Sequence, residues 1–396
     1  MERVGWAAAR ATAFAAASAL PTETVTVLEC VGRTLTRDVR ALQDVPHFVS
    51  SAMDGWAVAG RGPWQIVGEG GGRLEPGSAT PVVTGGVIRP GVTAVVRSEH
   101  GVVGASIAGH ELRMRDGLDP PPPGRDLRGA ATEARAGDVL ISAHIMLNPA
   151  HAAVAAASGH DTIGVAGRAR VAMLTTGTEV ISSGIPTPGF VRDSFGPMLP
   201  AAIAGMVGGA RVVSRIRLGD DRQLLLEAVK DADADVIVTT GGTANSPVDH
   251  VRSMLDELGA SLVVDGIAVR PGSPSLLARL PNGVFLVALP GNPLAAMVGA
   301  MLLLEPLLAA LAGHPLPEPV QVVVGEDHEP GKVRMLPYRL IDGRAVASGW
   351  RDSGMLRGLA DAHGVLVVPS EGVAAGVLAP TLPLPWAQTP RPGNFA

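Results

Sequence analysis

Apolar runs alternate with helix-like segments between residues 169 and 312. The runs ARVAML, ADVIV and VFLVAL each lead into a turn rich in Gly or Pro, and a helical pattern follows each turn. Strands that alternate with helices of this length are typical of βαβ units, in which helices cover both faces of a mainly parallel sheet. The pattern therefore predicts an α/β domain over residues 169–312.

Short β-like segments dominate two other parts of the chain. Pieces such as PWQIV and TAVVR are separated by Gly and Pro, a DPPPP joint follows them, and β-like pieces return after HPLPEP. Helical pattern flanks the first group, with Asn148-Pro149 as a helix start. We expect a small β domain at 45–123, inserted into a helical linker domain at 1–44 and 124–168, and a second small β domain at 313–396.

The first residues, MERVGWAAARATAFAAASALP, loosely resemble a secretory signal because arginines precede an Ala-rich run. Alanine is the strongest helix former, and Arg10 lies near the middle of the run. We therefore prefer the first helix of a cytoplasmic protein. No apolar run reaches the roughly 20 residues that span a bilayer, so we expect no membrane partner.

The amino-acid composition excludes several classes of function and site. The 396 residues include few aromatic side chains and no long Lys/Arg run, so we expect no nucleic-acid partner. Cys30 is the one cysteine, which excludes an intrachain disulfide and a cysteine metal cluster. The histidines lack metal-ligand spacing. A metal would have to be bound by carboxylates, which favours a hard ion such as Mg²⁺.

Two predicted strand ends carry turns suited to an anion, TTGTE at 175–179 and TTGGT at 239–243. Ligands of open α/β sheets bind beyond the carboxyl ends of the strands, where glycine permits close backbone approach and the next helix begins with a positive dipole. Further on, Ser246 can cap a helix and Asp249 lies near its start. Folding alone also requires such turn residues, and the dinucleotide and P-loop fingerprints are absent.

Acidic residues recur beside these turns: Glu179, Asp193, Asp220, Asp221 and Asp249. Carboxylates repel a phosphate unless a cation lies between them. A Mg²⁺ ion held by one or two carboxylates and the substrate phosphate resolves this conflict. A solvated acidic rim is the alternative interpretation.

Several motifs, in the same order, resemble the MoeA family, which includes the C-terminal part of gephyrin. SSAMDGWAV resembles the family's SAMDGYAV, VIVTTGGTANSPVDH resembles TTGGVSxGxxD, and VALPGNPLAA keeps LPGNPxSA almost unchanged. VVTGG followed by PGVTAVVRSEH resembles the family's TGAPxPxGADAVVxxE. VAMLTTGTEV resembles its strand and TGDEL turn, and VRPGSP resembles its KPGKP. The similarity extends over nearly the whole chain.

The resemblance implies a multidomain α/β plus β fold, with a MogA-like three-layer α/β domain, a parallel-rich sheet and the flanking domains given above. It implies a molybdopterin molybdenumtransferase: adenylylated molybdopterin binds, Mg²⁺ assists, molybdate enters the dithiolene and AMP leaves. It also implies a homodimer with each active cleft between the α/β domain of one subunit and the β module of the other.

The resemblance also assigns site residues by position. The implied catalytic residues are Asp54, Thr84, Glu179 and Asp249. The implied metal ligands are Glu179, Asp220 and Asp249. The implied molybdopterin-binding residues are Thr176, Gly177, Gly241, Gly242, Arg270, Ser273, Pro290, Gly291, Asn292 and Ser353. Arg270 and the backbone N–H groups of Gly241 and Gly242 are expected to stabilise phosphate charge.

Some positions depart from the family pattern. Thr178 replaces a carboxylate, Phe195 an asparagine, Ser273 a lysine and Ser246 a glycine, and Glu133 stands where aspartate is usual. A charged hydrogen bond contributes roughly 1.5–3 kcal/mol, so the change at Ser273 weakens anion binding about ten- to a hundredfold.

The hypothesis that follows is a fully or weakly active molybdenum insertase. A non-catalytic molybdopterin-binding or scaffold paralogue and an ATP-consuming adenylyl-transfer enzyme are the alternatives. Molybdate and tungstate fit equally, since both are tetrahedral oxyanions of nearly equal size.

Overall fold

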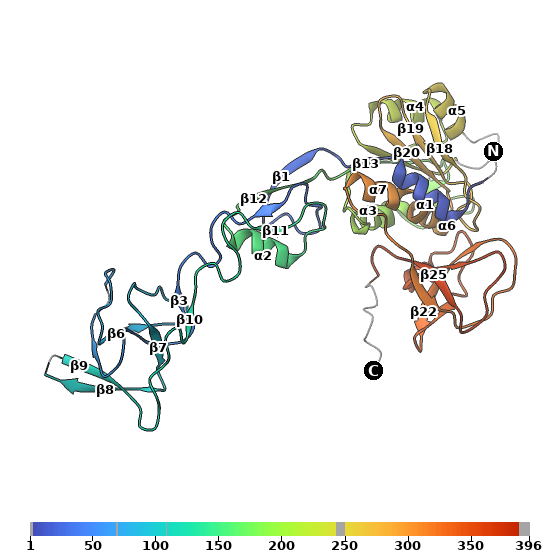
Figure 1. Ribbon diagram of the computed structural model, residues 1–396. Helices are drawn as coiled ribbons and strands as arrows, with labels where there is room; N and C mark the ends of the chain where they lie inside the picture. The colour runs from blue at the N-terminus through green and yellow to red at the C-terminus, as the bar shows by residue number, and fades with distance from the viewer. Residues whose placement is uncertain (1–2, 69, 108, 243–249, 388–396) are drawn as a thin grey trace.

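The computed structural model describes residues 3–68, 70–107, 109–242 and 250–387. Figure 1 shows an elongated molecule. The inserted β domain lies at one end and a small linking region follows it. The α/β domain lies at the other end, with the C-terminal β domain packed beside it.

Six strands form the sheet of the α/β domain, in the order β16-β13-β17-β20-β19-β18. The first four run parallel, and the last two continue the sheet antiparallel. Their bounds are β13 (Arg170–Thr175), β16 (Arg211–Arg217), β17 (Val236–Thr240), β18 (Ser261–Asp265), β19 (Leu276–Arg279) and β20 (Phe285–Leu289). β17 and β20 are buried at every position, as expected for parallel strands covered on both faces.

Helices cover the two faces of this sheet. Alternation along β13 sends Val171 and Met173 to one apolar core, and Ala172 and Leu174 to the other. The first core is closed by α1 (Trp6–Ala15), α3 (Phe195–Gly205), α6 (Pro293–Gly299), the π-helical segment η1 (Ala300–Leu304) and α7 (Glu305–Leu311). The second is closed by α4 (Arg222–Asp231) and α5 (His250–Glu257).

Within the described residues, one continuous helix, Pro293–Leu311, comes nearest to the roughly 20 residues that span a bilayer. It has 19 residues with a mean hydropathy of 2.1, which is long and apolar enough to cross a membrane, yet it is 100% buried within the fold. It packs against β20 on one side and α1 on another. A helix that is apolar all round is typical of the interior of a large domain, and burial here explains the composition.

The Ala-rich helix α1 packs on the α/β domain, whereas the sequence interpretation grouped it with the linker domain. Ala9 and Ala13 are fully buried in the first core, and α1 contacts η1 and α7. The alanines let the helices approach closely. Alanine content predicts that a helix forms, but a nearly uniform apolar surface does not reveal the domain against which it packs.

The linking region is mainly β, which corrects its prediction as helical. β1 (Thr22–Thr26) pairs with β12 (Thr162–Ala166), and β2 (Val39–Arg40) pairs with β11 (Val139–Ile141). Within the described residues its one helix is α2 (Pro149–Ala157), which begins as predicted at Asn148 with a reciprocal capping box to His151. β2 and β11, with two and three residues, are too short to show a period of two in the sequence.

The two remaining large sheets form the small β domains. In the inserted domain the strand order is β7-β4-β6-β5-β9-β8 around buried Trp64 and Leu112. Its strands are β4 (Gly55–Val58), β5 (Trp64–Ile66), β6 (Ser78–Val82), β7 (Ala94–Arg97), β8 (Gly101–Ser106) and β9 (Gly109–Met114), with β3 (Ser50–Ser51) and β10 (Leu127–Arg128) paired at its base.

The C-terminal domain has the strand order β21-β25-β24-β22-β23. Its elements are β21 (Val320–Val323), β22 (Arg334–Ile341), β23 (Arg344–Ala347), α8 (Arg357–Ala360), β24 (Gly364–Val368) and β25 (Leu378–Pro383). All pairs in this sheet are antiparallel.

Candidate functional site

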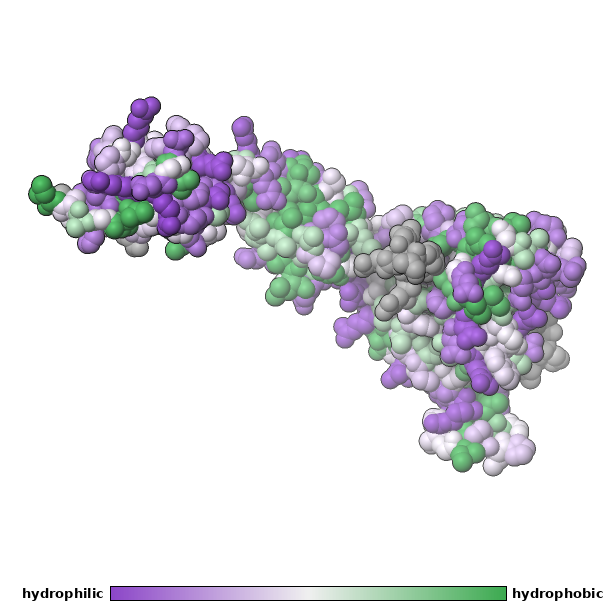
Figure 2. Space-filling model, turned by 90° about the horizontal axis from the view of Figure 1, so that it is seen from below, coloured by the Kyte–Doolittle hydropathy of each residue, from purple (hydrophilic) through white to green (hydrophobic). Residues whose placement is uncertain are grey.

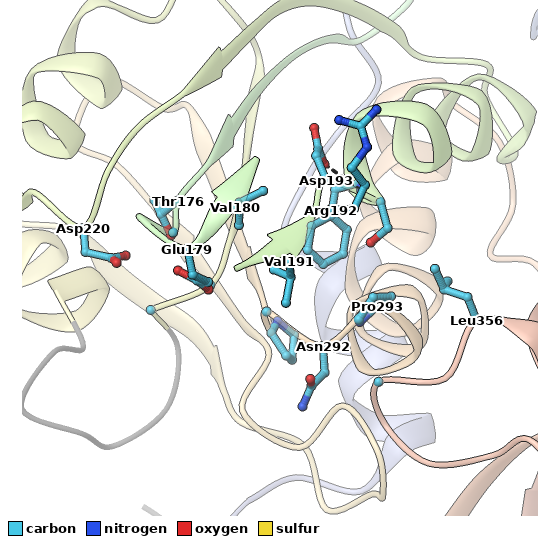
Figure 3. Close-up of a pocket in the computed structure, with 18 of the residues that line it drawn as sticks. Thr176, Glu179, Val180, Val191, Arg192, Asp193, Asp220, Asn292, Pro293 and Leu356 are labelled. Atoms are coloured by element: carbon cyan, nitrogen blue, oxygen red, sulfur yellow. Dashed lines mark hydrogen bonds between the residues drawn. The ribbon is translucent and has the colours of Figure 1, made fainter. Parts of the chain in front are cut away.

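A cavity of about 890 Å³ opens at the carboxyl ends of β13, β17 and β20 (Figure 3). This is the position at which open α/β sheets bind ligands, and the volume suits a nucleotide-sized molecule. Of the residues implied by resemblance, the cavity is lined by Thr176, Gly177, Glu179, Asp220, Gly241, Gly242, Pro290, Gly291 and Asn292.

The turn after β13 is fixed by close contacts. The Thr176 hydroxyl donates to the carbonyl of Thr240 at 2.8 Å, which joins this turn to the end of β17. Gly177 has a φ of +129°, and a Cβ there would lie 2.9 Å from a carboxylate oxygen of Glu179. Glycine is therefore required, and it brings the Glu179 carboxylate close to the backbone at the edge of the cavity.

The turn after β17 corrects one expectation. Gly241 has a φ of +90°, and a Cβ there would lie 2.8 Å from the Thr176 hydroxyl oxygen, so glycine is again required. However, the Gly241 N–H donates to the Leu289 carbonyl at 2.9 Å. It extends the sheet ladder and is not available to a phosphate as predicted. Of the pair, only Gly242 retains that predicted role.

The start of α3 contributes cavity residues that the resemblance did not assign to the site. One carboxylate oxygen of Asp193 accepts from the N–H groups of Phe195 and Gly196, both at 2.9 Å, and so caps the helix. Phe195 is buried in the first core although it also borders the cavity. The loop that delivers these residues is held by the short parallel pair β14 (Val180–Ile181) and β15 (Val191–Arg192).

Sequence reasoning missed the other members of this wall. They are Val180, Val191, Arg192, Ser194, Pro274, Pro293, Gly354 and Leu356. Figure 3 shows Arg192 and Asp193 on the opposite side of the cavity from Glu179 and Asp220. The acidic Asp193 ahead of a helix start was the sequence signal from which this wall could have been predicted. The two-residue strands β14 and β15 give no recognisable pattern.

A loop of the C-terminal domain closes the cavity at the start of α6. The Asn292 side-chain amide donates to the Ser353 hydroxyl at 3.1 Å. The Ser353 carbonyl accepts from the N–H groups of Leu294 and Ala295 at 3.0 and 3.3 Å. Ser353 therefore lies beside the cavity wall, and its backbone satisfies the helix N–H groups that an anion would otherwise meet.

Arg270 and Ser273 do not line this cavity. The Arg270 backbone pairs with the C-terminal domain, accepting from Met335 and donating to Val333, and its side chain is exposed. The Ser273 hydroxyl donates to the Ile267 carbonyl at 2.8 Å. Their segment reaches the cavity through Pro274.

Other predicted residues lie elsewhere. Asp54 and Thr84 are in the inserted β domain, far along the molecule from the cavity (Figure 1). Glu133 is in the linking region, where its N–H donates to the Val45 carbonyl. Asp249 and Ser246 lie outside the described residues.

Asp54 and Thr84 form a pair within the inserted domain. The same Asp54 oxygen accepts from the Thr84 N–H at 2.6 Å and from the Thr84 hydroxyl at 2.9 Å. These two donors, the backbone one first, lower the pKa of Asp54 below its usual 3.8. A carboxylate held in this way is an acceptor fixed in direction, with its charge retained at neutral pH.

We expect Thr84→Val to raise the pKa of Asp54 only in part, because the stronger backbone donor remains. As the pH falls, wild-type Asp54 should stay ionised past 3.8 and protonate below it, whereas the variant should protonate at a higher pH. Carbon-13 chemical shifts of the Asp54 carboxyl group measure both titrations, with Thr93→Val as the matched change in the same domain. Identical titration of Asp54 in wild type and Thr84→Val would contradict the assignment of the hydroxyl as a donor to the ionised form.

Glu179 and Asp220 are the described carboxylates that the prediction assigns to Mg²⁺. Within the residues that the structure describes, no group of three or more His, Cys, Asp or Glu side chains is placed to hold a metal ion. Mg²⁺ commonly uses one or two protein carboxylates and completes its shell with water and substrate phosphate. Glu179 and Asp220 line one cavity and supply hard oxygen donors, so the donor set fits this ion.

Comparisons with known proteins agree with this architecture. The description "MoeA N-terminal region (domain I and II)" matches residues 5–159, and "Probable molybdopterin binding domain" matches residues 172–310. A molybdopterin molybdenumtransferase of Nostoc sp. is 31% identical over 383 residues, which cover 88% of this chain and 85% of that protein. Molybdopterin molybdenumtransferase 2 of Mycobacterium tuberculosis is 31% identical over 388 residues, which cover 89% and 93%.

The solved structure of a molybdopterin biosynthesis MoeA protein from Pyrococcus horikosii shares the fold. It aligns with a TM-score of 0.78 at 24% identity, covering 96% of this chain and 99% of that one. Fold and cavity thus define a multidomain protein built around an α/β domain of the molybdopterin-binding class. The chain belongs to the MoeA family. The predicted resemblance and multidomain fold class are confirmed.

Proposed function

We propose that this chain is a molybdopterin molybdenumtransferase of molybdenum cofactor biosynthesis. It inserts molybdate into the dithiolene of adenylylated molybdopterin, and AMP is released. The observation that carries the proposal is the cavity of about 890 Å³ at the strand ends, with Glu179 and Asp220 in its wall. The names of the relatives that share 31% identity with the chain support the same reaction.

The residues of the cavity suit this substrate. The positive φ angles at positions 241 and 242 favour glycine, and because glycine has no side chain a ligand can lie directly against the backbone. The Asn292 amide donates to the Ser353 hydroxyl, which holds this polar side chain in place at the cavity wall. Glu179 and Asp220 would hold Mg²⁺. When bound, the ion would neutralise charge on the phosphate linkage and molybdate.

We further propose a cytoplasmic homodimer. Asp54 and Thr84 are far from the cavity of their own chain (Figure 1), so they would reach a cavity only in a second copy. The linking region carries exposed apolar side chains, including Leu28 at 91% and Leu42 at 62% exposure, and Figure 2 shows an apolar surface there. Such patches mark protein interfaces. Sedimentation at about twice the chain mass of 40.4 kDa is expected, and a monomer at micromolar concentration would contradict the dimer.

A single-turnover assay tests the reaction. Purified protein is mixed with adenylylated molybdopterin, Mg²⁺ and molybdate, and AMP is followed by chromatography. We expect AMP release that requires molybdate and stops when EDTA removes Mg²⁺. Binding of the substrate without AMP release would instead favour a non-catalytic paralogue. Consumption of ATP in a parallel reaction would favour adenylyl transfer, an alternative that the match to the MoeA N-terminal region disfavours.

A further inference from the structure

Thr178 and Asp220 bind each other through two hydrogen bonds at the rim of the cavity. The Thr178 N–H donates to one carboxylate oxygen of Asp220 at 3.0 Å. In return, the Asp220 N–H donates to the Thr178 hydroxyl oxygen at 3.1 Å. The side chain of each residue is thus an acceptor for the backbone of the other.

This reciprocal pair joins two turns that leave neighbouring strands. Thr178 follows β13 and Asp220 follows β16, and the last ladder bond between these segments runs from the Leu218 N–H to the Thr175 carbonyl at 2.8 Å. The Thr178–Asp220 pair connects the same two segments beyond the end of the ladder, at the cavity wall that Asp220 lines. The Thr178 N–H holds one Asp220 carboxylate oxygen directly, and the Thr178 hydroxyl fixes the Asp220 backbone from which that carboxylate extends.

Threonine achieves this without adding charge. The hydroxyl oxygen accepts the Asp220 N–H as a carboxylate could, but a carboxylate at this position would bring a second negative charge next to Asp220. Two carboxylates at hydrogen-bonding distance disfavour the ionised form of one of them. Threonine therefore leaves Asp220 oriented and free of a like-charged neighbour at residue 178.

We infer that Thr178 is a positioning residue, which acts through the Asp220 carboxylate to set how strongly the cavity holds Mg²⁺ with its substrate. The inference rests on the proposed function, since Asp220 is the predicted ligand. It differs from a purely structural role. A residue that only braced the turns would change the thermal stability of the protein, but its effect would not depend on whether Asp220 is ionisable.

The test uses the full chain and four variants: Thr178→Val, Thr178→Ser, Asp220→Asn and the double variant Thr178→Val with Asp220→Asn. The first readout is the Mg²⁺ concentration that gives half-maximal AMP release in a single turnover. The second needs no catalysis: it is the rise in melting temperature that Mg²⁺ adds to the complex with adenylylated molybdopterin.

Thr178→Val keeps the N–H that binds the Asp220 carboxylate and removes the hydroxyl that holds the Asp220 backbone. Loss of that one hydrogen bond predicts that Thr178→Val needs about fivefold more Mg²⁺ in both readouts, with Thr178→Ser close to wild type. Adding Thr178→Val to Asp220→Asn should have no further effect, because the positioned charge is already gone. Equal effects of Thr178→Val in both backgrounds, or an unchanged Mg²⁺ requirement, would overturn the inference. Thr178→Ala replaces Thr178→Val if the latter does not fold.

The two proposals can fail separately. If wild type releases no AMP but Mg²⁺ still stabilises its substrate complex, and Thr178→Val weakens that stabilisation, the positioning role stands and the transferase reaction falls. If wild type releases AMP and Thr178→Val has the same Mg²⁺ dependence, the reaction stands and the positioning role falls. Absence of any Mg²⁺ effect in wild type would overturn the inference.

Discussion

Arg10→Met should lower the free energy of unfolding by about 3–5 kcal/mol, the usual cost of leaving one member of a buried ion pair without its partner. Arg10 is 3% exposed and Glu305 is 8% exposed, and their side chains meet at 3.3 Å. Arg10 also donates to the carbonyls of Met301 and Pro317 at 2.5 and 2.6 Å. The substitution therefore leaves a carboxylate and two carbonyls without their donor.

The effect should depend on pH in a defined direction. Burial raises the pKa of Glu305 above its usual 4.5, while the charge of Arg10 opposes the rise. Without Arg10 the opposition disappears, so the folded variant binds a proton at a higher pH than the unfolded chain does. The loss of stability is then fully expressed above the raised pKa and shrinks as the pH falls toward 4.5.

Chemical denaturation at several pH values measures this prediction. The exposed Arg211→Met on β16 is the matched control and should change stability by less than about 0.5 kcal/mol. Arg10→Met combined with Glu305→Met should recover most of the loss, since apolar side chains of similar size can replace a buried ion pair at little cost. A loss below about 1 kcal/mol for Arg10→Met at neutral pH would contradict the buried-pair account.

The strands and turns around the cavity were predictable because their signals are local. An apolar run followed by a glycine turn specifies both the end of a strand and the backbone that meets a ligand, so Gly177, Glu179 and Gly242 were found from short motifs. Asp220 also lines the cavity as predicted. The partner of each backbone N–H could not be predicted from a short motif, because it depends on neighbouring strands. The Gly241 N–H, for example, donates to the Leu289 carbonyl on the adjacent strand.

The remaining wall of the cavity depends on contacts that short motifs do not carry. Leu356 and Gly354 arrive from the C-terminal domain, and Val191 arrives on a strand of two residues. Ser273 was assigned to the substrate from its place in a motif, yet its hydroxyl satisfies the Ile267 carbonyl. The short serine side chain forms a hydrogen bond within its own loop, whereas the lysine of the family pattern is long enough to extend beyond the loop.

Glu179→Gln should have the largest effect on the proposed reaction, lowering molybdate-dependent AMP release roughly 10²-fold, the scale of losing one preorganised electrostatic contact. Glu179 lines the cavity on the same side as Asp220, and its carbonyl accepts from the Val191 N–H at 2.9 Å. That backbone bond is unaffected by the substitution. Glutamine keeps the size of the side chain and removes its charge, so stability should change by less than about 0.5 kcal/mol at this exposed position.

A comparison of Glu179→Gln with a control variant shows whether Glu179 is a Mg²⁺ ligand or part of a solvated acidic rim. Glu227→Gln, on an exposed face of α4 outside the cavity, is the matched control and should release AMP at the wild-type rate. If Glu179 is a Mg²⁺ ligand, added Mg²⁺ should restore part of the activity of Glu179→Gln, because a weaker amide ligand can be offset by mass action. Wild-type activity in Glu179→Gln would show that this carboxylate only borders solvent, and Asp220 would then be the only described residue left of the predicted metal ligands.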